Sequence, residues 1–450
     1  MESFLISVIS FIICIAILIT VHEFGHFWVA RKFNVKVLRF SIGFGKTLVR
    51  FRGKKDNTEF VLAALPLGGY VKMLGEGDEH VKPEELHRTF DHQNVYKRFA
   101  IVIAGPLVNF IFAVFAFFLM YLIGITGIKP IMGEMDKDSI AWQSGFRQGD
   151  QIIQIDGNDV VTFGSMYEEL LPFFIDRENV SVLIHSGQHL KLNLSAIPKS
   201  IEASHLHQSI GFQLDLPKVE AVIGKVFPDT PAQQAGLQEN DKIVSIDDKA
   251  VSDWMDLVSY VKQRPNKKMQ IMLIRDNNEK IIDLISASDM RNGKQVGILG
   301  IANKYKAVFD DSMVVVNRYS VGGALIKGVE KTWSMSLLTL KVFGKMLIGE
   351  ASLKNISGPI TIAEVAGNSF KQGIEYFLRF LAIVSLSLGV INLLPIPILD
   401  GGHLMFYLVE MIKGNPVSEK VRDFSLKIGI AILAMLMSLA IYNDIYRLLS

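Results

Sequence analysis

Thr20-Val21-His22-Glu23-Phe24-Gly25-His26-Phe27 closes an apolar run that begins near Phe4. On a helix, His22 and His26 stand one turn apart on one face, so both imidazoles can reach one metal ion. In the His-Glu-x-x-His pattern the two histidines hold zinc, and the glutamate, here Glu23, takes a proton from the water that attacks a carbonyl. Such residues are costly at the end of a membrane-length segment. The stretch therefore indicates a metal site, and not two histidines that only hydrogen-bond.

The composition indicates a membrane protein. Half of the 450 residues are hydrophobic and 20% are charged. The apolar residues gather in four blocks, which are Phe4 to Thr20, Phe99 to Ile125, Phe377 to Leu394 and Ile428 to Ile441. About 20 residues cross a bilayer, so we expect four transmembrane helices in contact with membrane lipids.

Three further features narrow the class of protein. The net charge of +2 says little about partners, and we expect no nucleic acid among them. The first block lacks both a preceding basic residue and a cleavage site of small residues, so we expect a retained helix and not a signal peptide. Cys14 is the only cysteine, which excludes disulfides and cysteine-based zinc sites.

Lysine and arginine set the expected orientation. They are frequent between Arg31 and Arg98 and again in the short connection after the third block. The positive-inside rule makes both connections cytoplasmic. Both termini and the long middle region then lie on the outer side. His22 lies about 27 Å along a helix that begins near Phe4, close to the inner membrane edge, and Asn392 reaches a comparable depth on the third helix.

The sequence between the first two blocks predicts strands. Val35 to Met73 reads as a hairpin with a turn cluster at Gly53-Lys54-Lys55-Asp56-Asn57. The hairpin is either a small cytoplasmic sheet or an edge that dips toward the active site and holds an extended substrate by strand addition. We expect the second.

Glu76 to Gln93 reads as a solvated loop whose histidines, His80, His87 and His92, lack ligand spacing. In the second block, we expect Pro106 to kink the helix, and Asn109 needs a polar partner. That partner is either a substrate backbone or a neighbouring helix.

The middle region contains a repeat. Residues 139–146 align with residues 230–237, and residues 149–157 with residues 240–248, at an offset of 91 residues. Each copy has a short helix that ends in Gly, then Asp-x-Ile and a strand ending in Ile-Asp. Each copy continues with a helix and a strand pair. This sequence pattern resembles that of PDZ domains, which bind peptide ends by strand addition. The pair either captures a peptide or only screens access to the membrane site. After it, residues 319 to 351 predict an amphipathic helix on the outer membrane surface.

A catalytic zinc ion usually has three protein ligands and a water. Asn392-Leu393-Leu394-Pro395-Ile396-Pro397-Ile398-Leu399-Asp400-Gly401-Gly402 supplies the expected third one, the Asp400 carboxylate. The two prolines prevent a continuous helix and let the carboxylate turn toward the metal. Asn392 can donate a hydrogen bond to the oxyanion that forms on the attacked carbonyl.

Together these motifs resemble the site-2 protease family of intramembrane zinc metalloproteases, over the whole chain. The resemblance implies that His22, His26 and Asp400 bind Zn²⁺, that Glu23 is the general base and that Asn392 supports the transition state. It also implies a bacterial inner-membrane enzyme that cuts single-pass membrane proteins, among them an anti-sigma factor in envelope stress signalling, and remnant signal peptides.

The expected fold class is a multi-pass α-helical membrane protein with four transmembrane helices, a membrane-associated β-hairpin and two tandem α+β PDZ domains. The expected division is the first transmembrane helix with the zinc motif at 1–30, the hairpin and loop at 31–96, the second helix at 97–125, the PDZ domains at 126–218 and 219–310, the amphipathic region at 311–370, the third helix with the Asn/Asp motif at 371–404, a cytoplasmic connection at 405–424 and the fourth helix at 425–450.

Three other classes would account for parts of the chain. A PDZ-bearing scaffold would need no metal, a transporter would use the intramembrane polar residues as an ion path, and a zinc-dependent chaperone would bind substrates without cutting them. Replacing Glu23 by Gln separates these classes from a protease.

Overall fold

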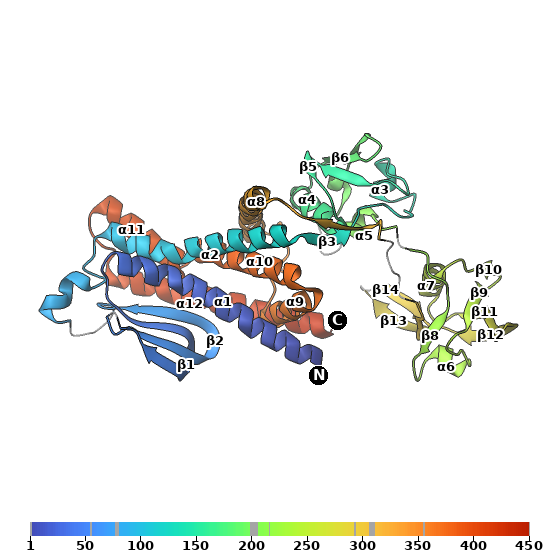
Figure 1. Cartoon of the computed structure of the whole chain (residues 1–450), viewed down its shortest axis with the longest axis horizontal. Helices are drawn as coiled ribbons and strands as arrows, with labels where there is room; N and C mark the ends of the chain where they lie inside the picture. Colours follow the sequence, from blue (N-terminus) through green and yellow to red (C-terminus); the bar gives the residue numbers. More distant parts are fainter. Residues whose placement is uncertain are drawn as a thin grey trace.

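The structure is a computed structural model, in which apolar helices form the body of the protein. The structure describes all residues except 1, 55, 77–80, 199–205, 216, 292–293, 306–310, 354–355 and 450. Four helices of the described part are long and apolar enough to cross a membrane: α1 (Glu2–Lys32), α2 (Val95–Ile123), α10 (Ile374–Leu393) and α12 (Glu419–Leu449). They run along the long axis of the molecule (Figure 1). Large apolar side chains from three of them interlock, as Leu18 of α1 does with Phe377 and Leu381 of α10 and with Phe112 of α2.

The predicted hairpin is present as β1 (Val37–Arg52) and β2 (Glu59–Met73), with the turn where the sequence places it. Residues 39–42 of β1 pair on one side with residues 69–72 and on the other with residues 59–62. Both strands therefore bend, β1 at Gly43 and Gly45 and β2 at Gly68, where positive φ angles favour glycine. One edge of the resulting sheet is the stretch 69–73, and the opposite edge is the second half of β1.

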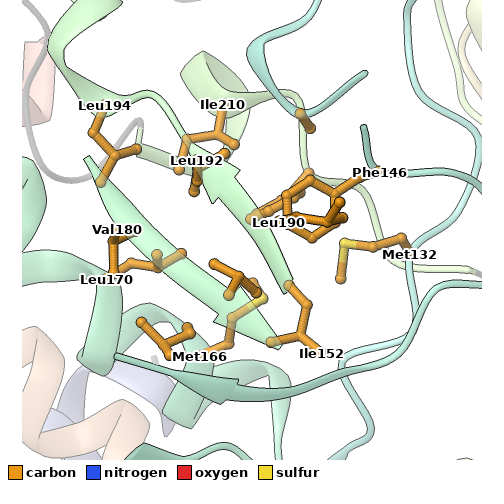
Figure 2. Packing of buried hydrophobic residues seen from close by; sticks show 14 of the residues in the cluster. Met132, Phe146, Ile152, Met166, Leu170, Val180, Leu190, Leu192, Leu194 and Ile210 are labelled. Carbon is orange, nitrogen blue, oxygen red and sulfur yellow. The ribbon is translucent and has the colours of Figure 1, made fainter. Parts of the chain in front are cut away.

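The middle region contains two sheets of the same design. Strands β4 (Ile152–Ile155), β5 (Asn158–Asp159), β6 (Val180–Ile184) and β7 (His189–Leu192) have the order β5-β4-β6-β7. Strands β9 (Lys242–Ile246), β10 (Lys249–Ala250), β11 (Lys268–Arg275) and β12 (Asn278–Ile285) have the order β10-β9-β11-β12. A helix accompanies each sheet, α4 (Phe163–Asp176) or α7 (Trp254–Lys262). In Figure 2, Met166 and Leu170 of α4 pack against the first sheet.

Shorter elements complete the chain. They are the two-stranded pairs β3 (Ile125–Ile128) with β16 (Val314–Asn317), β8 (Ile223–Val226) with β15 (Ile301–Asn303) and β13 (Ala287–Arg291) with β14 (Lys294–Ile298), the helices α3 (Ile140–Gln143), α5 (Leu206–Ile210) and α6 (Pro231–Gln234), and the 3-10 turns Pro83–Arg88 and Leu194–Ala196.

The structure differs from the expected course of the chain in the last third. The amphipathic helix is α8 (Val321–Leu347), and a separate helix, α9 (Pro359–Gln372), forms the last part of the amphipathic region expected at 311–370. The expected third segment at 371–404 divides at its two prolines, as the sequence predicts, because α10 ends at Leu393. The difference is a new helix after the prolines, α11 (Asp400–Lys413), which extends into the expected connection at 405–424. Pro395 and Pro397 cause this division, because neither ring can continue the α10 hydrogen bonds. His80 and the expected boundary at 310 lie outside the described residues.

Both termini lie at the same end of the helical bundle, and the hairpin lies beside the opposite end of α1 (Figure 1). The C-terminal end of α1 carries the His22-Glu23-Phe24-Gly25-His26 motif, so the motif is at the hairpin end of the bundle.

Candidate active site

Three side chains that are far apart in the sequence meet at the hairpin end. His22 Nε2 lies 3.2 Å from Asp400 Oδ2 and His26 Nε2 lies 3.6 Å from the same oxygen. The two Nε2 atoms are 3.3 Å apart. These residues are the only group of three or more His, Cys, Asp or Glu in the described part of the chain whose ligand atoms are close enough to hold one metal ion.

The spacing fits zinc. With bonds of about 2.0 to 2.1 Å, two ligand atoms of a tetrahedral zinc ion are about 3.3 Å apart, which matches the three distances given above. Asp400 Oδ2 is buried and has no conventional hydrogen bond to the described residues, although both imidazoles face it. A buried carboxylate oxygen in this position is costly unless a cation or a proton donor compensates it. Two nitrogens and one carboxylate oxygen also form a donor set typical of catalytic zinc.

Helix α2 fixes the orientation of both rings. His26 Nδ1 lies 2.9 Å from the carbonyl oxygen of Ile101. A carbonyl can only accept, so Nδ1 carries the proton, and in the neutral ring the Nε2 lone pair is free for a metal. His22 Nδ1 lies 3.1 Å from the side-chain amide nitrogen of Asn109, a residue that is fully buried. The partner of Asn109 is therefore the neighbouring helix, one of the two alternatives that the sequence left open.

Two glycines allow α1 and α2 to come this close. A Cβ atom on Gly105 would lie 2.3 Å from His26 Nε2 and 3.0 Å from His22 Cε1. A Cβ atom on Gly25 would lie 2.4 Å from the carbonyl oxygen of Ala104. The helices can cross here only without these side chains. Nothing in the sequence pattern alone links Gly105 to this cluster of side chains.

The Asp400 carboxylate is positioned by a tight turn between α10 and α11. Cβ atoms on Gly401 and Gly402 would lie 2.1 Å from the Leu394 oxygen and 2.6 Å from the Ile396 oxygen. Ile398 has φ 130°, an unusual value for a β-branched residue. An ion pair of 2.6 Å between Arg98 of α2 and Glu410 of α11 holds the two helices together.

The remaining predicted residues lie around this cluster. Glu23 is 8% exposed, and a Cβ atom on Gly69 of the hairpin would lie 2.9 Å from its Cγ atom. Asn392 is half-buried in the last turn of α10 and, within the described residues, makes no hydrogen bond to the cluster. The structure thus brings Glu23 to the hairpin edge but does not join Asn392 to the metal ligands.

The sequence is similar to that of known peptidases over its whole length. A model of peptidase family M50 matches residues 10–436. The chain belongs to peptidase family M50. It is 41% identical to the regulator of sigma-E protease RseP of Escherichia coli over the full length of both chains, and 39% identical to the protease RseP of Yersinia pestis, again over both full lengths. It is also 39% identical to a putative zinc metalloprotease of Neisseria meningitidis, over 98% of this chain and 99% of that one.

Membership of family M50 confirms the resemblance to the site-2 proteases. The chain is therefore a zinc-dependent intramembrane metalloprotease. Its four apolar helices agree with a membrane protein that crosses the bilayer several times. As an M50 enzyme it is neither a scaffold, a transporter nor a chaperone, the three other classes considered from the sequence.

Proposed function

We propose that His22, His26 and Asp400 hold the zinc ion of this protease and that Glu23 is its general base. The observation that carries the proposal is the set of three ligand atoms at 3.2 to 3.6 Å from one another, with the Glu23 side chain buried beside them. Bound there, zinc would supply Lewis acidity and lower the pKa of water.

The protein residues would carry the proton. The Glu23 carboxylate accepts a proton from the attacking water and passes it to the leaving amine nitrogen, so one group serves first as base and then as acid. The Asn392 side chain donates an N–H to the carbonyl oxygen as its negative charge grows. Because the site is buried between helices, this charge is poorly screened by solvent, and a correctly placed donor stabilises it more than it would in water.

The hairpin would present the substrate. A carbonyl inside a helix is bonded and covered, so a membrane substrate has to be locally unwound before it can be attacked. The stretch 69–73 is an edge of the β1–β2 sheet, and a Cβ atom on its Gly69 would lie 2.9 Å from Glu23 Cγ. An unwound substrate added to this edge gains backbone hydrogen bonds and lies beside the general base.

The substrates that we propose are single-pass membrane proteins. The Escherichia coli relative is named a regulator of sigma-E protease, which supports an anti-sigma factor as one substrate. Remnant signal peptides are a second class, and membrane lipids surround the helices. We place the enzyme in a bacterial inner membrane, with the termini and the two repeated units periplasmic and the active site near the cytoplasmic side.

We further propose that the two units are PDZ domains, on the basis of the 91-residue repeat and their common strand order. They either capture the outer end of a trimmed substrate or exclude substrates with large intact outer domains. An outer domain of increasing size fused to one substrate distinguishes these roles, because only exclusion makes cleavage fall with size when the end of the chain is unchanged.

The variant Glu23→Gln tests the proposed base. It keeps the size of the side chain and removes its basicity, so we expect it to retain one zinc ion per chain and to yield no cleaved membrane substrate by mass spectrometry. Glu330→Gln is a matched control, since Glu330 is exposed on α8 and pairs with Lys327. Product formation by Glu23→Gln at the rate of this control would show that Glu23 is not the base.

Proline substitutions test the hairpin edge. Ile42 is unsuitable for this test, because it pairs with both Gly69 and Leu62 and a proline there would break the sheet itself. Tyr70→Pro changes the edge near Glu23, and Val49→Pro changes the opposite edge. We expect only Tyr70→Pro to abolish cleavage of a membrane substrate. Equal cleavage by the two variants would remove the edge 69–73 from the mechanism.

A further inference from the structure

Asn109 stands out among the buried polar residues that the proposed mechanism does not use. Its side chain has no exposed surface. The amide nitrogen Nδ2 faces His22 Nδ1 at 3.1 Å, while within the described part of the chain the amide oxygen Oδ1 is buried without a hydrogen-bond partner. A buried amide oxygen without a partner costs free energy, so its position calls for an explanation.

The arrangement shown corresponds to one of the two neutral forms of His22. When Asn109 Nδ2 donates to Nδ1, the His22 proton is on Nε2, the atom that lies 3.2 Å from Asp400. In that form Nε2 has no lone pair to offer a metal. A metal on Nε2 moves the proton to Nδ1, which then needs an acceptor.

We infer that Asn109 is a positioning residue for the metal site. When zinc is bound, its amide oxygen accepts a hydrogen bond from the Nδ1–H group of His22. A half-turn of the amide group exchanges Oδ1 and Nδ2, two atoms of similar size, and replaces the donor with the acceptor that the ring requires. His26 has a fixed acceptor in the Ile101 carbonyl, so α2 serves both histidine ligands. The inference rests on the proposed zinc site.

Three substitutions test it with zinc affinity as the readout, measured by chelator competition on the purified full chain. Asn109→Leu removes the acceptor, and we expect zinc binding to weaken by about 10- to 100-fold, the usual effect of losing such a partner. Asn109→Asp keeps an acceptor and cannot donate, so we expect it to bind zinc as the wild type does. If the amide instead serves as a donor, Asn109→Asp loses zinc as Asn109→Leu does.

Ser385→Ala is the matched control. Ser385 Oγ donates to the Asn109 backbone carbonyl at 2.9 Å, and Ser385 is as deeply buried as Asn109. This variant removes an α10–α2 hydrogen bond at the same residue without affecting the imidazole. We expect the zinc affinity of Ser385→Ala to be unchanged, because the Asn109 side chain stays in place. If Asn109 only joined helices, Ser385→Ala and Asn109→Leu would weaken zinc binding to a similar extent.

A spectroscopic measurement keeps the inference testable if a variant fails to fold. Loaded with Co²⁺, the wild type should show two exchangeable, strongly shifted imidazole N–H proton signals, one each from His22 and His26. In Asn109→Leu the His22 signal should exchange rapidly with water. A wild-type His22 signal already lost to exchange, or zinc affinity in Asn109→Leu equal to that of the wild type, would overturn the inference. A wild type that binds no zinc would instead overturn the proposed function.

Discussion

Gly105→Ala is a sharp test of how the helices hold the metal site. The added methyl group would lie 2.3 Å from His26 Nε2, whereas ordinary contacts of a Cβ atom begin near 3.4 Å. The His26 ring must therefore move by about 1 Å, or the two helices must separate, at a typical overpacking cost of about 1 to 3 kcal/mol. Because a zinc–nitrogen bond is only about 2 Å long, a shift of this size removes a ligand. We expect kcat/KM to fall by at least about 100-fold.

The assay combines two measurements on folded, monodisperse protein: zinc per chain by mass spectrometry and cleavage of a single-pass membrane substrate. Gly344→Ala is the control, because a Cβ atom at this position of α8 meets nothing within 4 Å. We expect the control to keep both zinc and activity. One zinc per chain together with normal cleavage in Gly105→Ala would refute the conclusion that α2 packs directly on the two histidines.

Three further predictions concern regions outside the metal ligands. Asp444→Ala removes the acceptor for the backbone N–H groups of Gly358 and Ile360 at the start of α9. Thermal unfolding should show that the free energy of unfolding falls by about 2 kcal/mol. Burial raises the pKa of Glu76 from 4.5 to about 7, so its stabilising contribution is present below pH 4.5 and is lost as the pH rises through 7. Glu76→Gln should therefore leave the melting temperature unchanged near pH 4.5 and raise it above pH 7. The corresponding gain in the free energy of unfolding is at most about 3 kcal/mol. Glu168 of α4 pairs with Arg379 of α10, so Glu168→Ala should loosen the first repeated unit and, if that unit excludes large substrates, increase cleavage of a substrate with an intact outer domain.

The sequence predicts that His22, His26 and Asp400 meet because the geometry follows from simple rules. A spacing of four residues puts His22 and His26 on one helix face, and the charge distribution along the chain brings the inner ends of the first and third helices to the same depth. Asp400 is the group there that can complete a zinc site. None of these steps needs the angle or the distance at which two helices pack.

The features that the sequence did not predict depend on such packing. The role of Gly105 follows from the crossing of α1 and α2, which hydrophobic blocks do not encode. Helix α9 was not predicted as a separate helix, although it begins with Pro359 and proline is favoured in the first turn of a helix. Helix α11 had its own signals, Asp400 in the first turn and Gly414 in the left-handed conformation after the last, but they followed two prolines.

The metal site couples three distant parts of the chain. Helix α2 supplies no ligand, yet Ile101, Gly105 and Asn109 contact or orient both histidines of α1. The proposed third ligand, Asp400, is the first residue of α11, and a Cβ atom on Gly429 of α12 would lie 2.0 Å from the Pro397 oxygen of the turn that precedes it. The turn is thus held between α11 and α12. Because metal binding is coupled to folding, zinc binding at the proposed site depends on the docking of the last third of the chain. The proposed site is therefore complete only in the assembled helical bundle.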